Sequence, residues 1–259
     1  MNSAARRAWV NLASVLATIT VNALANIIPF NGQNTGQVSD RFKVYFVPNG
    51  YVFAIWGVIY LAWLLFCIYQ LLPANRDKPR FAALGYWFAL SGVFNSLWLV
   101  CWHYNQFTLS LVVMFALLTT LIVSYRRLGV GRTPSGAMER WCVDAPFGLY
   151  LGWISVATIA NAADVLWLNN WSGWGLSPQL WTAIMLAVAT LRAVVIVWRR
   201  HDVLFPLVFV WAFVGIADRQ SGPAALPHPE LVVNAALAAA AVSLLLALTA
   251  VGLRVRAAR

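Results

Sequence analysis

The sequence predicts an all-α protein that crosses a lipid bilayer eight times. Of the 259 residues, 61% are apolar or aromatic and only 10% are charged, whereas soluble domains carry about 25% charged residues. Apolar segments long enough to span hydrocarbon recur along the chain. The basic residues gather in alternate connections between these segments. The exterior of the protein is therefore expected to face lipid.

The eight predicted spans are segments that meet the length a membrane requires. A helix needs about 20 mainly apolar residues to cross roughly 30 Å of hydrocarbon. Short connections rich in Asn, Gly and Pro separate the segments. The span at 203–219 is the weakest, because it holds Pro206 and ends in charged residues. The spans fall at residues 8–29, 47–72, 81–103, 107–125, 142–168, 178–198, 203–219 and 231–253.

The basic residues predict the orientation, because Lys and Arg collect on the cytoplasmic side of a membrane. Only Arg41, Lys43 and Arg219 lie in the outer connections, and Arg192 lies within a span. We therefore expect both termini to be cytoplasmic, in the cytoplasmic membrane of a bacterium. The net charge of +10 then reflects topology and does not indicate nucleic acid as a partner. The other fourteen basic residues fall in the inner segments: Arg6, Arg7, Arg76, Lys78, Arg80, Arg126, Arg127, Arg132, Arg140, Arg199, Arg200, Arg254, Arg256 and Arg259.

Aromatic residues recur at helical spacing in three predicted spans of a chain that has 14 tryptophans. Each stripe combines flat rings with hydrogen-bonding groups on one helix face. Ordinary helix packing explains the same spacing. The asparagines favour a ligand cavity, because an amide in hydrocarbon needs a partner. The stripes comprise Phe53, Trp56, Tyr60 and Trp63; Asn95, Trp98 and Trp102; and Tyr150, Trp153 and Asn161.

Three ionisable residues fall inside the predicted spans and are costly there. Asp144 and Arg192 lie at similar depth on the cytoplasmic side of adjacent spans, which predicts an intramembrane ion pair. Asp164 lies nearer the outer surface. A structural or snorkelling role is the alternative for all three residues.

The sequence shows no familiar catalytic or metal-binding motif, such as HExxH, GxSxG or a phosphate loop. The three histidines lie at span ends or in loops. We therefore name no catalytic residue and no metal ligand, and whether the protein is an enzyme stays open.

Two connections carry features of their own. The segment from Asn31 to Tyr45 is polar and could act as a lid or as a solvated connector. The segment from Asn169 to Pro178 has no charge and holds Trp171 and Trp174. Tryptophans in such a loop favour the lipid headgroup level over ligand contact.

Three segments, taken in order, resemble the TspO/MBR family of tryptophan-rich sensory or translocator proteins, also called peripheral benzodiazepine receptors. Residues 48–60, PNGYVFAIWGVIY, are similar to its second-helix pattern. Residues 94–98, FNSLW, are similar to its third-helix Asn-x-x-Trp motif. Residues 146–161 match its fifth-helix pattern from Pro146 to Asn161. The resemblance covers about residues 8–168.

The resemblance implies a five-helix bundle over residues 1–168, followed by three further transmembrane helices in residues 169–259 that have no counterpart in the family pattern. Family members bind porphyrins, haem breakdown products and isoquinoline-type drugs, and some bind cholesterol. The family's Lys-Pro-x-x-x-Pro-Pro run is reduced here to Pro48, so the geometry of the family's loop is not carried over to this chain. By position, the pocket candidates are Phe53, Trp56, Tyr60, Asn95, Trp98, Tyr150, Trp153 and Asn161.

These observations predict a membrane-embedded binding or sensory protein that takes a flat apolar ligand, such as a porphyrin or haem-type tetrapyrrole, and requires no cofactor. The expected partners are the lipid bilayer and this small molecule, and a homodimer is left open. One alternative is a secondary transporter with Asp144, Asp164 and Arg192 as coupling charges, although no internal repeat supports it. The other is an enzyme that degrades porphyrins.

Overall fold

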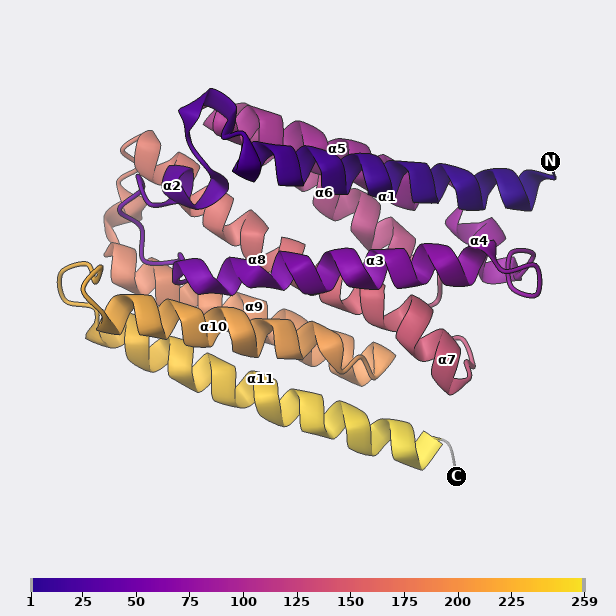
Figure 1. Cartoon of the computed structure of the whole chain (residues 1–259). Coiled ribbons are helices and arrows are strands. Elements are labelled where there is room, and N and C mark those ends of the chain that lie inside the picture. Colours follow the sequence, from indigo (N-terminus) through magenta and orange to yellow (C-terminus); the bar gives the residue numbers. More distant parts are fainter. Residues whose placement is uncertain (1, 258–259) are drawn as a thin grey trace. The chain divides into compact units, whose positions relative to one another are not determined.

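The computed structural model describes residues 2–257, and these residues form helices without a strand (Figure 1). The all-α prediction is therefore confirmed. Arg259, counted among the inner basic residues, lies outside the described residues. The long helices are α1 (Ser3–Ile27), α3 (Ile55–Leu71), α5 (Trp87–His103), α6 (Phe107–Arg127), α8 (Ala145–Leu168), α9 (Pro178–Arg200), α10 (Leu204–Ser221) and α11 (Glu230–Ala257). The short elements are η1 (Phe30–Gly32), α2 (Thr35–Ser39), η2 (Gly50–Ala54), α4 (Pro79–Leu84), α7 (Ala137–Glu139), η3 (Arg140–Asp144) and η4 (Gly173–Gly175).

Six helical segments among the described residues are long and apolar enough to cross a membrane. The two remaining predicted spans, 81–103 and 203–219, coincide with shorter helices, α5 with 17 residues and α10 with 18. The first of these spans is interrupted because Gly85, the residue after α4, has a positive φ of 59° that breaks the helix before α5 begins. Several crossings are thus established, and the count of eight stays a prediction. The six segments are Ser3–Ile27, Gly50–Leu71, Phe107–Arg127, Ala137–Leu168, Pro178–Arg200 and Glu230–Arg256.

The chain forms two compact units, one of residues 1–38 and 54–154, the other of residues 39–53 and 155–259. These units are defined by contacts within the chain and do not test the predicted division into residues 1–168 and 169–259, which stays a prediction. In unit 1, α1 packs against α3 and α5, and α5 packs against α6. In unit 2, α9, α10 and α11 pack against one another.

Helix α1 buries a stripe of alanines, one valine and three polar residues, and it exposes large apolar side chains. Apart from Ala5, its buried positions recur at alternating steps of four and three residues, as in a helix that packs along one seam. Large apolar side chains of α1, such as Trp9 and Leu16, are about half exposed. This arrangement suits a helix whose outer surface meets lipid. The buried residues are Ala4, Ala5, Ala8, Asn11, Val15, Thr18, Asn22 and Ala25.

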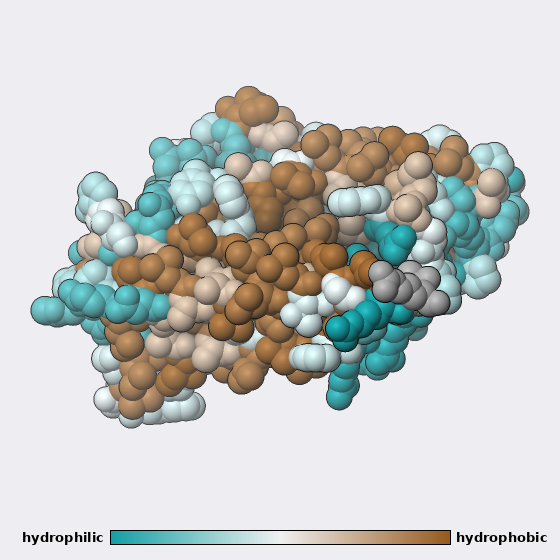
Figure 2. All heavy atoms as spheres, turned by 90° about the horizontal axis from the view of Figure 1, so that it is seen from below, coloured by the Kyte–Doolittle hydropathy of each residue, from teal (hydrophilic) through white to brown (hydrophobic). Residues whose placement is uncertain are grey.

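Unit 2 also presents apolar side chains at its surface. On α11, Leu245 and Leu248 are 63% and 60% exposed, while Ala236 and Ala250 on the same helix are fully buried. Small residues let the neighbouring helices approach closely. Figure 2, viewed from the side of α11, shows apolar residues over much of this face. Lipid contact along α11 follows from this pattern.

Candidate functional site

The aromatic face of α3 begins the candidate site. Trp56, Tyr60 and Trp63 follow one another at helical spacing, so their rings line one side of the helix. Trp56 and Tyr60 stack with ring centroids 5.6 Å apart and planes at 28°. Tyr60 and Trp63 follow at 5.4 Å. Three consecutive rings therefore form a continuous aromatic wall.

Helix α8 brings two further rings to this wall. The centroids of Tyr150 and Trp153 each lie 6.2 Å from that of Trp56. Tyr150 also meets Trp63 at 4.6 Å. These distances fall in the range in which aromatic pairs attract. Trp56, Tyr60, Trp63, Tyr150 and Trp153 are called the aromatic cluster below.

A chain of amides joins the aromatic cluster to two other helices. Asn95 Nδ2 on α5 donates to the Tyr150 hydroxyl at 3.1 Å. Asn22 Nδ2 on α1 donates to Asn95 Oδ1 at 2.9 Å. All three residues are buried, so each hydrogen bond satisfies a polar group that would be costly in hydrocarbon. The predicted polar partner of the rings, Asn95, therefore does meet them.

The two faces of the aromatic cluster differ in exposure. Trp63, Tyr150 and Trp153 are at most 2% exposed. Trp56 and Tyr60 are only partly buried. Behind Trp63, the rings of Phe88 and other phenylalanines fill the interior. The cluster is thus closed on its inner side and accessible at Trp56 and Tyr60.

The other predicted pocket residues have different surroundings. Trp98 is buried on α5 and stacks on Trp102 at 5.8 Å with planes at 22°. Phe53 and Asn161 belong to unit 2, whereas the aromatic cluster belongs to unit 1. That these three residues line one pocket with the cluster stays a prediction.

Two residues of the site were missed by the sequence-based selection. Trp63 belongs to the stripe recognised on its helix but was left out of the pocket candidates. Asn22 was not singled out, although an amide in the middle of a span signals a buried partner. Both contact the predicted residues directly.

A second polar cluster in unit 1 surrounds Arg80, whose side chain is 6% exposed. Arg80 donates to Asp144 and, at 2.8 Å, to Glu139. Its Nε also donates to the carbonyl of Leu128 at 3.0 Å. Lys78 Nζ reaches the other oxygen of Glu139 at 2.8 Å. The cluster ties the start of α4 to α7 and to the π-helical turn η3.

The structure therefore gives Asp144 an ionic partner that the sequence did not indicate. Arg80 was counted among the solvated inner residues, because nothing in its spacing shows that the side chain turns inward. The predicted pairing of Asp144 with Arg192 would join unit 1 to unit 2, and it stays a prediction. Asp164, the third ionisable residue, is 2% exposed within α8.

Several membrane-spanning helices and an internal cluster of rings and amides define an integral membrane protein of the multi-pass helical class. The chain belongs to the TSPO-like protein family, whose family model matches residues 8–249. No curated protein and no solved structure matches the chain. The matched region extends past residue 168, where the motif resemblance ended, and it includes α9, α10 and most of α11.

Proposed function

We propose that this protein binds a flat, apolar ligand, of which a porphyrin or a related tetrapyrrole is the type, at the aromatic cluster. The observation that carries the proposal is that α3 and α8 bring five rings into mutual contact. Small-molecule sites of this kind have mostly apolar and aromatic walls with a few polar groups. Membership of the TSPO-like family supports the same kind of protein.

The accessible edge of the cluster suits a planar ligand. Trp56 contacts four rings of the cluster and is itself partly exposed. A tetrapyrrole that stacks on Trp56 and Tyr60 would extend the existing series of ring contacts. Each ring pair contributes about 0.5–1.5 kcal/mol beyond the burial of apolar area.

The amide chain positions the rings on which the ligand would stack. Asn95 donates a hydrogen bond to the hydroxyl of the buried Tyr150, and the ring of Tyr150 contacts Trp56. Loss of Asn95 is therefore expected to alter ligand orientation more than affinity.

Titration of protoporphyrin into the detergent-solubilised protein tests the proposal. Trp56→Ala is expected to weaken binding about threefold to tenfold or more, the equivalent of one lost ring contact. Trp9→Ala is the matched control, because Trp9 lies on the exposed side of α1. Tryptophan quenching and the porphyrin absorbance band are recorded together. Non-saturable binding to the wild type, or equal affinity of the two variants, would reject the site.

The proposal also covers the membrane in which the protein lies, the orientation of its termini and its oligomeric state. We infer a bacterial cytoplasmic membrane with both termini on the cytoplasmic side, from the distribution of basic residues. A homodimer, which the sequence leaves open, is part of the same proposal, and chemical cross-linking in native membranes tests it. A purely monomeric pattern over a range of cross-linker concentrations would remove the dimer.

A further inference from the structure

The exposed face of α5 is apolar along its length and has a tyrosine at each end. Its exposed positions recur at steps of four and three residues, so they lie on one face of the helix. From Tyr86 to Tyr104 the axis rises roughly 27 Å, close to the thickness of the hydrocarbon layer. Tyrosine is enriched where a membrane meets water, so Tyr86 is expected at the level of the lipid headgroups. The exposed residues are Tyr86, Leu90, Val93, Leu97, Val100 and Tyr104.

Two arginines from other helices of unit 1 meet the start of α5. Arg6 Nε on α1 donates to the Tyr86 hydroxyl at 3.0 Å. The guanidinium carbon of Arg127, at the end of α6, lies over the Trp87 ring at 5.5 Å from its centroid, within the range of a cation–π contact. Arg127 Nη1 also donates to the Ala83 carbonyl at 3.2 Å. Both guanidinium groups are thus held beside consecutive aromatic residues. Arg6, Tyr86, Trp87 and Arg127 are called the basic rim below.

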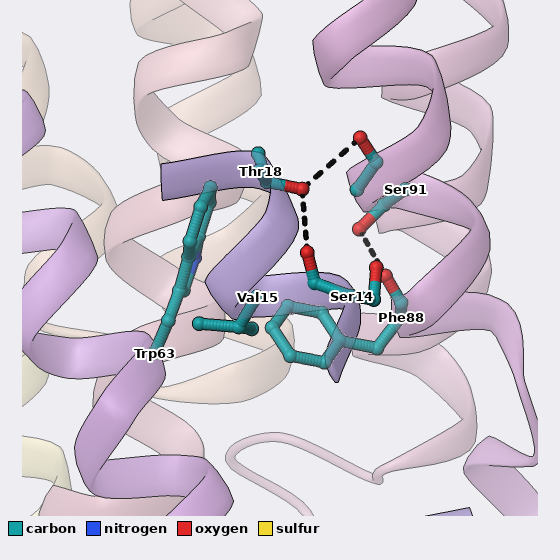
Figure 3. Close-up of a pocket in the computed structure, with 7 residues that line it drawn as sticks. Ser14, Val15, Thr18, Trp63, Phe88 and Ser91 are labelled. Atoms are coloured by element: carbon teal, nitrogen blue, oxygen red, sulfur yellow. Dashed lines mark hydrogen bonds between the residues drawn. The ribbon is translucent and has the colours of Figure 1, made fainter. Parts of the chain in front are cut away.

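The packing of α1 against α5 keeps Arg6 in this place. Ser14 Oγ donates to the Ala89 carbonyl at 2.9 Å. Farther along α1, Thr18 Oγ1 lies within hydrogen-bond distance of the Gly92 carbonyl, at 3.2 Å (Figure 3). A Cβ at Gly92 would meet both hydroxyls, so glycine permits the close approach of the two helices. The start of α1 is therefore fixed beside the start of α5.

The charge of the basic rim is not neutralised by the protein. Arg6 and Arg127 are exposed, and neither pairs with a carboxylate among the described residues. Arg80 differs, because two carboxylates neutralise it. A guanidinium has five N–H donors, and Arg6 and Arg127 each use one of them in a hydrogen bond to the protein. The remaining donors are available to an anion.

We propose that the basic rim binds the headgroup phosphate of an anionic phospholipid. Guanidinium groups match phosphate oxygens in charge and in hydrogen-bond geometry. The acyl chains of a lipid whose phosphate lies at this level extend along the apolar face of α5. A lipid therefore fits both parts of the surface, the cationic end and the apolar face, whereas a free phosphate fits only the first.

Lipid titration of the delipidated protein in a neutral detergent tests the proposal, with native mass spectrometry counting the bound lipid. The probes are dioleoyl phosphatidylglycerol and dioleoyl phosphatidylcholine, which have the same chains, so the ratio of their affinities isolates the charge of the headgroup. We expect the wild type to prefer phosphatidylglycerol. Arg6→Gln and Arg127→Gln should each lower the ratio about fivefold, as expected for the loss of one basic residue near anionic lipid. Equal affinities of the wild type for the two lipids would overturn the proposal.

Arg126→Gln is the matched control, because it removes the same charge one residue before Arg127. The side chain of Arg126 is exposed and makes no hydrogen bond or ring contact among the described residues, so this variant should keep the wild-type ratio. Equal losses for Arg126→Gln and Arg127→Gln would indicate attraction by net charge alone and would overturn the site. A variant that folds less well loses both lipids alike, so an unchanged ratio in Arg6→Gln and Arg127→Gln also overturns it.

Inorganic phosphate distinguishes a lipid site from a plain anion site. It offers the same oxygens to the basic rim but has no chains to contact the apolar face of α5. We therefore expect that phosphate at the same concentration as phosphatidylglycerol does not displace the lipid from the wild type. Displacement at equal concentration would show that the acyl chains contribute nothing, and the assignment to a phospholipid would be overturned.

Discussion

Trp63 and Tyr150 bring their ring centroids within 4.6 Å, with planes at 66°. The edge of one ring meets the face of the other, which is the arrangement that the charge distribution of aromatic rings favours. The hydroxyl of the same Tyr150 accepts the hydrogen bond from Asn95. Tyr150 on α8 is therefore the residue at which the rings of α3 and the amide of α5 meet.

The hydroxyl and the ring of Tyr150 are expected to contribute separately to stability. Tyr150→Phe removes the partner of a buried amide and should lower the free energy of unfolding by about 1–2 kcal/mol. Tyr150→Ala also leaves a cavity beside Trp63 and should cost about 3–5 kcal/mol. Unfolding in detergent measures both. Tyr104→Phe serves as the control, because Tyr104 is 54% exposed. If Tyr150→Phe were as stable as Tyr104→Phe, the hydrogen bond between Asn95 and Tyr150 would not contribute to stability.

Helical spacing predicted which aromatic residues share a helix face, but it did not predict which residues of other helices they contact. The stripes on α3 and α8 follow from residue periodicity, because positions three or four apart share a face. Which faces meet depends on helix packing, which a single sequence does not specify. Asn22 and Arg80 show this limit, because each finds its partner on another element, Asn95 and Asp144 respectively.

The break between α4 and α5 shows a second limit. Hydropathy alone joined residues 81–103 into one span, since the whole segment is apolar. The positive φ of Gly85 ends α4, and a glycine within an apolar run does not by itself indicate whether a helix continues or stops. Local backbone conformation therefore decides a boundary that composition cannot.

The buried pair of Arg80 and Asp144 predicts a large penalty when one partner is removed. Arg80→Met removes the buried guanidinium that donates to Asp144 and Glu139 and should destabilise unit 1 by about 3–5 kcal/mol. The double variant with Asp144→Leu should recover part of that loss, because the carboxylate that faced Arg80 is removed as well. Denaturation of the purified variants gives the comparison.

The control for the ion pair lies on the same segment of chain. Arg76 pairs with Asp77 at 3.6 Å, and their side chains are 37% and 64% exposed. An exposed pair contributes about 0–1 kcal/mol, so Arg76→Met should be nearly neutral. Equal losses for Arg76→Met and Arg80→Met would argue against a special role of the buried pair.

Lys78 predicts a loss of stability at high pH. Partial burial lowers the pKa of Lys78, but hydrogen bonds to Glu139 and Tyr69 outweigh it, so the pKa is raised above its ordinary value of 10.5. A raised pKa in the folded state means that the stabilisation is complete below the unfolded-state pKa and is lost as the pH rises through the folded-state pKa.

Stability measured between pH 8 and pH 12 tests this sign. The difference between the wild type and Lys78→Met should be constant below about pH 10 and should narrow above it. Lys43→Met, in the connection before η2, is the control that carries the same change of charge. A difference that widens with rising pH would contradict the assigned direction of the pKa shift.

The distribution of basic residues predicts where fusion reporters are active. Fusions after Arg76 and after Arg259 should both report the cytoplasm, since an even number of crossings separates them from the N-terminus. A fusion within the Asn169–Pro178 connection should report the outside. A C-terminal fusion that reports the outside would rule out eight spans with both ends inside.

Gly215 on α10 predicts a steric conflict on substitution. A Cβ added at Gly215 would clash with Cγ2 of Val52, which lies in η2. Either Val52 or the backbone at Gly215 would then have to move. The segment that contains η2 is fixed by Asn49 N, which donates to the Gly215 carbonyl at 2.9 Å, and by Trp211 Nε1, which donates to the Val52 carbonyl at 2.9 Å. The close approach therefore requires glycine at this position.

Gly215→Ala is accordingly expected to destabilise unit 2 by about 1–3 kcal/mol, the usual cost of overpacking. Gly57→Ala is the matched control, because a Cβ there meets no atom within 4 Å, and alanine is favoured over glycine in a helix by about 1 kcal/mol. In a double-mutant cycle, Val52→Ala should relieve most of the penalty of Gly215→Ala, since it removes the methyl groups in conflict. Thermal unfolding measures the stability of both single variants and of the double variant. If the losses of stability caused by Gly215→Ala and Val52→Ala simply add in the double variant, the contact between Gly215 and Val52 does not hold η2 against α10.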